Sequence, residues 1–207
     1  MNSYVALGDS FTAGTGCLPG EGWADRLASA LANGGDFAYE NLAVDGATSD
    51  VVRRQLGRAL QLEPDLVTVV CGTNDLLYGR RDPLAYSRNL SAILGGLVRA
   101  LPTVRLVTAT APERWDFLGL GPRTRARLEA GLVRMNHATR ALAAAHGAAV
   151  LDVAGHPGLS QAENFAGDGL HPSALGHRRA AEAFGELIAA RFEIPIRQEA
   201  IDLNERL

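Results

Sequence analysis

The sequence has little cysteine and no long apolar run, and each shortage excludes a class of protein. Two cysteines, Cys17 and Cys71, cannot make the disulfide framework of a small secreted domain. No apolar stretch approaches the ~20 residues that a membrane-spanning helix needs. The opening residues, 1–4, lack the charged segment and apolar stretch of a secretory signal. We therefore expect a cytoplasmic protein that does not insert into membranes.

Basic residues are too few and too scattered for a nucleic-acid-binding protein. The chain has 20 lysines and arginines against 23 acidic residues, and its net charge is −3. A nucleic-acid-binding domain needs a clustered basic face, and here the arginine pairs stand apart from one another. Nucleic acid is therefore not an expected partner.

Several motifs that bind metals and cofactors are also missing. There is no H-E-x-x-H, no paired C-x-x-C and no other spacing typical of metal ligands. The glycines between Gly8 and Gly16 lack the lysine and the spacing of a phosphate-binding loop. The G-x-S-x-G motif of the α/β-hydrolases is absent as well. We expect no cofactor and no catalytic metal.

The length and composition favour one globular domain. Hydrophobic residues make up 47% of the 207 positions, which is enough to bury a sizeable core. We assign this domain to residues 1–192. The charged segment 193–207 lies beyond it, and the sequence leaves three roles open for that segment: a tail, an added helix, or a subunit contact that makes the chain an oligomer.

Apolar segments alternate with segments of helical pattern along the chain. Five segments are predicted to be buried strands: 4–7, 39–42, 66–71, 104–110 and 149–153. Five helices are predicted between and after them: 23–32, 50–60, 83–100, 123–146 and 173–191. Regular alternation of strand and helix predicts an α/β fold, with a parallel sheet and helices on both faces.

Chemically useful residues follow the ends of these strands. Ser10 comes directly after the first strand, and Asp168-Gly169-Leu170-His171 comes after the fifth. In an open α/β sheet, ligands bind beyond the carboxyl ends of the strands. A serine hydroxyl becomes a nucleophile when a base takes its proton, and an imidazole suits that role near neutral pH. Asp168 lies three residues before His171 and can hold its other ring nitrogen, so Ser10, His171 and Asp168 form a candidate catalytic triad.

Two further segments fall on the same edge of the sheet. Gly46 follows the second strand, and Gly72-Thr73-Asn74-Asp75 follows the third. Taken singly, Gly46 and Asn74 are also residues that ordinary turns use, and Asp168 and His171 can simply cap a turn and a helix.

Taken together and in this order, the blocks Gly8-Asp9-Ser10, Gly46, Gly72-Thr73-Asn74-Asp75 and Asp168-x-x-His171 make the chain resemble the SGNH hydrolases, also called GDSL-type esterases and lipases. The resemblance extends over roughly residues 4–190. Phe11 stands where the family name implies leucine. The resemblance implies a three-layer, flavodoxin-like fold with five parallel strands in the order 2-1-3-4-5.

The resemblance also implies an activity. The expected enzyme is a serine esterase or lipase that cleaves a small-molecule carboxylic ester, with short to medium acyl or acetyl groups, through an acyl-enzyme. Three oxyanion donors are implied: the backbone N–H groups of Ser10 and Gly46 and the side-chain amide of Asn74. The alternatives are a non-catalytic binding module that kept the fold, and an acyltransferase or thioesterase that uses the same triad.

The segment 112–122 is the candidate for substrate selection. It follows the fourth strand on the same edge, and it is glycine-bounded and apolar. Its large side chains can form a wall or a lid for the acyl chain, or they can close the core beneath a loop. These side chains are Trp115, Phe117, Leu118 and Leu120.

Overall fold

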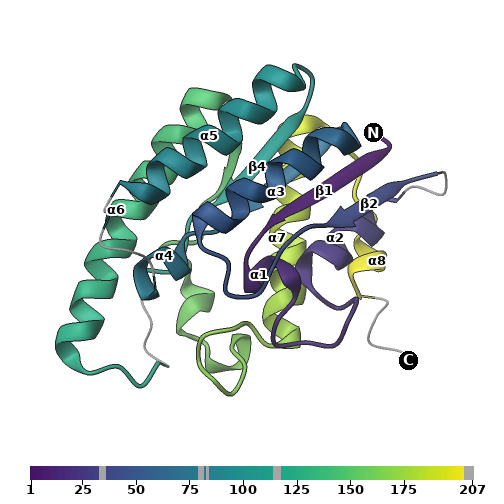
Figure 1. Ribbon diagram of the computed structural model, residues 1–207. Coiled ribbons are helices and arrows are strands. Elements are labelled where there is room, and N and C mark those ends of the chain that lie inside the picture. Colours follow the sequence, from purple (N-terminus) through teal and green to yellow (C-terminus); the bar gives the residue numbers. More distant parts are fainter. Residues whose placement is uncertain (33–35, 79–81, 83, 114–117, 203–207) are drawn as a thin grey trace.

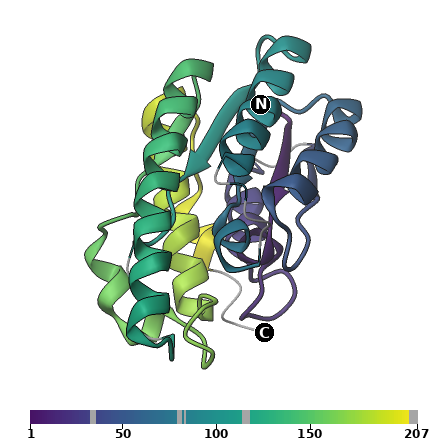
Figure 2. The same ribbon diagram turned by 60° about the vertical axis from the view of Figure 1, so that its left-hand side comes forward.

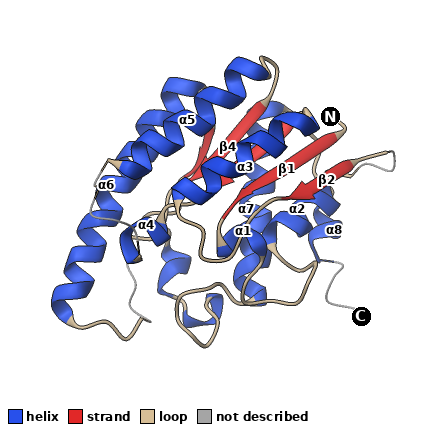
Figure 3. Ribbon diagram, in the orientation of Figure 1, coloured by secondary structure: helices blue, strands red, loops and turns tan. Residues whose placement is uncertain are grey.

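The protein is built on a five-stranded parallel sheet (Figure 1). The computed structural model describes residues 1–32, 36–78, 82, 84–113 and 118–202. The strand order is β2-β1-β3-β4-β5, and every neighbouring pair is parallel, so the strands run in one direction (Figure 3). Both the predicted fold class and the predicted strand order are confirmed. The strands are β1 (Ser3–Gly8), β2 (Ala38–Asn41), β3 (Leu66–Val70), β4 (Arg105–Ala109) and β5 (Ala149–Leu151).

Helices cover both faces of the sheet, and each face has its own core (Figure 2). One layer contains α2 (Trp23–Leu31), α7 (Ala174–Phe192) and α8 (Gln198–Asp202). The other contains α3 (Ser49–Leu62), α5 (Ala85–Ala100) and α6 (Pro122–His146). Within the described ranges, none of the helices is long and apolar enough to cross a membrane.

Local sequence signals account for most of the element boundaries. Pro122 opens α6, and Gly147 ends it in the left-handed conformation that favours glycine. The sequence also favours Ser173 as the N-cap of the last helix, and its hydroxyl does accept a hydrogen bond from the Gly176 N–H and so caps α7. By the same reasoning Asp82 is expected to cap the helix 83–100, and this prediction is wrong, because α5 begins only at Ala85. Asp82 lies outside the helix, and its carboxylate accepts a hydrogen bond from the Leu84 N–H before the first turn.

Four short helical segments were not predicted from the sequence. The helices α1 (Ser10–Ala13) and α4 (Thr73–Leu77) follow β1 and β3 almost at once, and the 3-10 turns Pro157–Ser160 and Ala162–Asn164 follow β5. Helices of three to five residues are too short to show the 3.6-residue periodicity on which helix prediction depends. The consequence is functional, because α1 and α4 carry Ser10 and Asn74.

The residues just after the main domain pack against it. Ile201 on α8 is fully buried, and its carbonyl oxygen accepts a hydrogen bond of 2.6 Å from Nη1 of Arg26. Arg26 is itself buried in α2, and a buried charged group without a hydrogen-bond partner costs folding free energy. The Ile201 carbonyl supplies such a partner. Part of segment 193–207 is therefore a helix that completes the core on the α2–α7 side.

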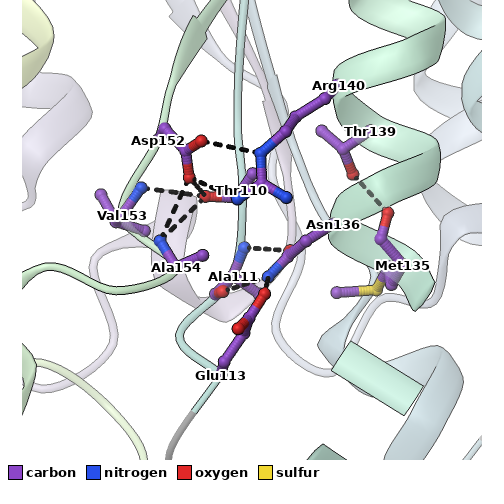
Figure 4. Close-up of polar contacts among 10 residues, drawn as sticks. All are labelled: Thr110, Ala111, Glu113, Met135, Asn136, Thr139, Arg140, Asp152, Val153 and Ala154. Atoms are coloured by element: carbon purple, nitrogen blue, oxygen red, sulfur yellow. Dashed lines mark hydrogen bonds and ion pairs between the residues drawn. The ribbon is translucent and has the colours of Figure 1, made fainter. Parts of the chain in front are cut away.

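Polar contacts fasten the carboxyl ends of β4 and β5 to α6 (Figure 4). Thr110 donates to Asp152 at 2.9 Å, and Arg140 binds the same carboxylate with two hydrogen bonds of 2.7 and 2.8 Å. The fully buried amide of Asn136 both accepts from the backbone N–H of Ala111 and donates to its carbonyl, each at 2.8 Å. These bonds hold the strand ends from which the segment 112–122 departs.

Candidate active site

Ser10 lies at a sharp turn between β1 and α1. The carboxylate of Asp9 caps α1 by accepting from the Phe11 N–H at 3.2 Å. A side chain at Gly8 would lie 2.3 Å from the Thr12 hydroxyl and 2.6 Å from the carbonyl oxygen of Val70. Only glycine lets the helix begin this close to the sheet, and the turn leaves Ser10 half-buried at the edge where the strands end.

His171 contacts Ser10 on one side and Asp168 on the other. Its Nε2 atom lies 3.0 Å from Ser10 Oγ, and its Nδ1 atom lies 2.6 Å from Asp168 Oδ2. Because a carboxylate only accepts hydrogen bonds, Nδ1 carries the proton in the neutral ring and Nε2 is left to accept from the serine hydroxyl. The three side chains thus have the contacts that a catalytic triad requires.

The carboxylate of Asp168 is held in its charged form. Partial burial acts to raise the pKa of Asp168, but the hydrogen bonds from His171 Nδ1 and from the backbone N–H groups of Leu170 and His171 outweigh it. The net effect lowers the pKa of Asp168 to about 2. A fixed negative charge at this position orients the imidazole and stabilises its protonated form.

Gly46 lies in a turn that contacts Asn74 on the short helix α4. Gly46 has a φ of +70°, and its turn is closed by a hydrogen bond from the Ala47 N–H to the Val44 carbonyl. Asn74 is 7% exposed, and its Nδ2 donates to the carbonyl oxygen of Ala47 at 3.1 Å. That bond uses one of the two amide hydrogens of Asn74 and leaves the other available. In the part of the chain that the structure describes, neither Ser10 nor Gly46 donates its backbone N–H to a protein acceptor.

Two acidic residues beside the site brace its turns. Asp75 accepts from both the N–H and the hydroxyl of Ser49, at 2.7 and 2.5 Å, and so ties α4 to α3. Burial raises the pKa of Asp9 to about 7, and the neighbouring charge of Asp75 adds to the increase. Burial also raises the pKa of the Cys71 thiol well above its usual value, so Cys71 lacks the thiolate that a cysteine nucleophile needs.

The predicted substrate segment is described only in part. Leu118 and Leu120 are half-buried and pack against the core between the sheet and the α3–α5–α6 layer. The predicted Trp115 and Phe117 lie outside the described residues. Leu118 and Leu120 therefore lie at the border of the core rather than on a free surface.

Two residues that support the site, His177 and Thr15, could not be assigned partners from the sequence. The His177 side chain is fully buried in α7, donates through Nε2 to the Thr15 carbonyl and accepts from the Trp23 N–H through Nδ1. Thr15 lies in the loop after α1. Nothing in the sequence pairs residues 162 positions apart, although a histidine on the buried face of a helix is a signal that a partner is needed.

Comparison with known proteins identifies the family. The model of the GDSL-like lipase/acylhydrolase family matches residues 6–179. The chain belongs to this family. Membership confirms the resemblance stated from the sequence, and it makes the protein a hydrolytic enzyme of the esterase/lipase type. The match covers Ser10, Gly46, Asn74, Asp168 and His171.

Several solved structures share the fold. A lipase/acylhydrolase from Enterococcus faecalis is 23% identical, with a TM-score of 0.73 over 92% of this chain and 97% of that one. The psychrotrophic esterase EstA from Pseudoalteromonas sp., in a structure inhibited by monoethylphosphonate, is 21% identical, with a TM-score of 0.71 over 93% and 100%. A protein from Lactobacillus plantarum is 26% identical, with a TM-score of 0.68 over 92% and 98%. No curated protein matches the chain.

Proposed function

We propose that this protein is a serine esterase that cleaves small carboxylic esters through an acyl-enzyme on Ser10. The observation that carries the proposal is the double contact of His171, with Nε2 at 3.0 Å from Ser10 Oγ and Nδ1 at 2.6 Å from Asp168. A nucleophile, a base and a group that orients the base are the minimum set for acyl transfer, and these three side chains supply it.

In the acylation step, Ser10 Oγ attacks the carbonyl carbon of the ester while its proton passes to His171 Nε2. The new C–O bond converts the carbonyl oxygen into an oxyanion, and the imidazolium is balanced by the Asp168 carboxylate. The C–O bond to the leaving alcohol then breaks, and His171 returns the proton to the departing alkoxide. The products are an alcohol and an ester between the acyl group and Ser10.

In the deacylation step, water takes the place of the serine hydroxyl. His171 Nε2 accepts a proton from the water as its oxygen attacks the acyl carbon, and the same proton then goes to Ser10 Oγ as the acyl–serine bond breaks. The carboxylic acid leaves, and the free enzyme is restored. The same base serves both steps because it returns to its neutral form after each.

Three hydrogen-bond donors stabilise the negative charge on the oxyanion. We assign this role to the backbone N–H groups of Ser10 and Gly46 and to the second amide hydrogen of Asn74. The first two have no acceptor in the described structure, and Asn74 is buried beside the turn of Gly46 with one hydrogen to spare. Preorganised donors of this kind act only as charge develops, so they lower the barrier without strengthening substrate binding.

The proposal is tested by covalent labelling. An organophosphonate probe is incubated with wild type, Ser10→Ala and the control Ser29→Ala, and esterase activity is followed with an activated aryl ester. Ser29 lies exposed on α2, away from the strand ends. We expect the probe to attach to Ser10 and abolish activity in wild type and Ser29→Ala, and we expect Ser10→Ala to be inactive and unlabelled. Labelling at another residue, or activity in Ser10→Ala, would overturn the assignment.

The substrate class is proposed as esters with short to medium acyl or acetyl groups. Thioesterase and acyltransferase activity use the same triad, so a panel of aryl esters, thioesters and acetylated sugars, assayed with and without an added alcohol as acyl acceptor, separates them. Each compound is assayed with wild type against Ser10→Ala. We expect the highest kcat/KM on an ester of short or medium acyl length. Preference for a thioester, or for an alcohol acceptor over water, would replace this substrate class while leaving the triad in place.

A further inference from the structure

Thr15 makes hydrogen bonds in three directions. Its N–H donates to the carbonyl oxygen of Ser10 at 3.0 Å, and its own carbonyl accepts from Nε2 of His177 at 3.0 Å. Its hydroxyl donates to the carboxylate of Asp45 at 2.5 Å. One residue therefore joins the turn of Ser10, the helix that follows His171, and the turn that contains Gly46.

Side chains bind the two neighbours of Gly46, one on each side of the glycine. Asp45 is held by Thr15, and the carbonyl of Ala47 is held by the amide of Asn74 at 3.1 Å. Gly46 itself is exposed, and no atom lies within 4 Å of the place where a side chain would begin. Packing therefore does not orient this residue. These two bonds do so, together with the backbone bond from the Val44 N–H to the Gly8 carbonyl at 3.2 Å.

The hydrogen bond between Thr15 and Asp45 affects the direction of the Gly46 N–H. This N–H belongs to the peptide unit that joins Asp45 to Gly46, so its direction depends on where the backbone of Asp45 lies. An oxyanion donor acts only when it lies 2.7–3.1 Å from the developing charge. Among the described residues, Thr15 is the one hydrogen-bond partner of Asp45 itself, and the next bond on that side of the turn runs from the Val44 N–H to the Gly8 carbonyl at 3.2 Å.

The residues that contact Thr15 on the side away from Asp45 are held firmly by packing. His177 is fully buried, stacks on Phe11 with ring centroids 5.8 Å apart, and accepts from the Trp23 N–H. The next residue, Gly16, has a φ of +107°, and a side chain there would lie 2.1 Å from the carbonyl oxygen of Pro172. The loop that contains Thr15 and Gly16 therefore packs against the residues that follow His171. Its Thr15 hydroxyl is a fixed hydrogen-bond donor for Asp45.

We propose that Thr15, through Asp45, is a positioning residue that aims the Gly46 N–H at the oxyanion. The inference rests on the proposed function, because it assumes an acyl transfer on Ser10. Thr15 touches no reacting atom. It acts by setting the distance between the turn that carries the nucleophile and the turn that carries an oxyanion donor.

The test compares two substitutions at Thr15 that separate shape from hydrogen bonding. Thr15→Val keeps the branched shape and removes the hydroxyl, and Thr15→Ser keeps the hydroxyl. The matched control is Thr124→Val on the exposed first turn of α6. For each variant, kcat, KM, the pH profile and the thermal midpoint are measured on one activated ester.

We expect Thr15→Val to lower kcat about 10-fold, a part of the roughly 10²–10³-fold that the complete loss of one oxyanion donor costs. KM and the pH profile should stay unchanged, because substrate binding and the triad are intact. The rate of inactivation by an organophosphonate should fall with kcat, since its phosphoryl oxygen needs the same donors. Thr15→Ser and Thr124→Val should both behave as wild type.

Asp45 provides the second half of the test. Asp45→Asn keeps an acceptor for the Thr15 hydroxyl, so it should retain kcat, whereas Asp45→Ala should lose as much as Thr15→Val. The double variant Thr15→Val/Asp45→Ala should be no slower than the slower single variant, because both changes break one bond. Additive losses would overturn the proposal, and so would a kcat of Thr15→Val equal to wild type.

Ser10→Ala distinguishes this inference from the proposed function. Activity in Ser10→Ala overturns both of them. An inactive Ser10→Ala together with an unimpaired Thr15→Val overturns the positioning role alone. A fall in the thermal midpoint of Thr15→Val with kcat retained identifies Thr15 as a structural residue and likewise overturns it.

Discussion

Nε2 of His171 lies 3.0 Å from Oγ of Ser10, although 161 positions separate the two residues. The contact spans almost the whole chain, from the end of the first strand to the loop before α7. It depends on Asp168, whose carboxylate holds the other side of the imidazole ring.

Activity should fall on acidification, because His171 accepts a proton only in its neutral form. The pKa of Asp168 is lowered to about 2, so that carboxylate stays charged over the range in which an imidazole titrates. Protonation of Asp168 therefore does not contribute to the acid limb of kcat/KM. His171→Ala should remove most of the activity, and Asp168→Asn should be milder. A profile that is flat from mildly acidic to mildly alkaline pH would contradict the role of His171.

Asn74→Ala should lower kcat by roughly 10²–10³-fold, about 3–4 kcal/mol, and change KM little, as expected for the loss of an oxyanion donor. The same substitution removes the bond to the Ala47 carbonyl, so the Gly46 turn loses one of the hydrogen bonds that hold it as well. Asn74→Asp should be at least as damaging, because a carboxylate repels the oxyanion. Steady-state kinetics with thermal melts test this, and a loss confined to KM would make Asn74 a turn residue only.

Asp9→Asn should stabilise the protein at alkaline pH more than at acidic pH. Burial raises the pKa of Asp9 to about 7, so between about pH 4 and pH 7 the folded state binds a proton that the unfolded state has released. Stability from this group therefore falls as pH rises through that window. The amide of Asn keeps an acceptor for the Phe11 N–H without the charge. Denaturant unfolding at pH 5 and pH 8 measures the effect, and an equal change at both would contradict it.

His177→Gln should make stability less sensitive to acid. Burial lowers the pKa of His177, so the unfolded state protonates first as pH falls below about 6.5, and the folded state loses stability until its own pKa is reached. Glutamine offers a donor and an acceptor but does not titrate. Arg26, His171 and Asp25 also act on the pKa of His177 and are unchanged in this variant. Unfolding between pH 7.5 and pH 5 should show a smaller loss for the variant than for wild type.

The fold and the set of candidate residues were predictable because their signals are local. The run Leu66–Val70 is apolar and β-branched, as a strand covered on both faces must be, and the alternation of such runs with helical patterns implies a parallel sheet. In a parallel sheet all carboxyl ends share one edge, so Ser10, Gly46 and Asn74 were expected to lie together. The short helix α1 was not predicted, because four residues show no periodicity.

The amino-acid sequence alone determined the α/β class, the strand order through the family resemblance, and the edge of the sheet on which the chemistry lies. Tertiary structure decided how closely the groups at that edge meet. The Ser10–His171 contact, the use of Thr15 to hold Asp45, and the burial of His177 and Ile201 all join segments that lie far apart in the chain. Such contacts depend on how helices and loops pack on the sheet, and the sequence pattern within one segment does not predict that packing.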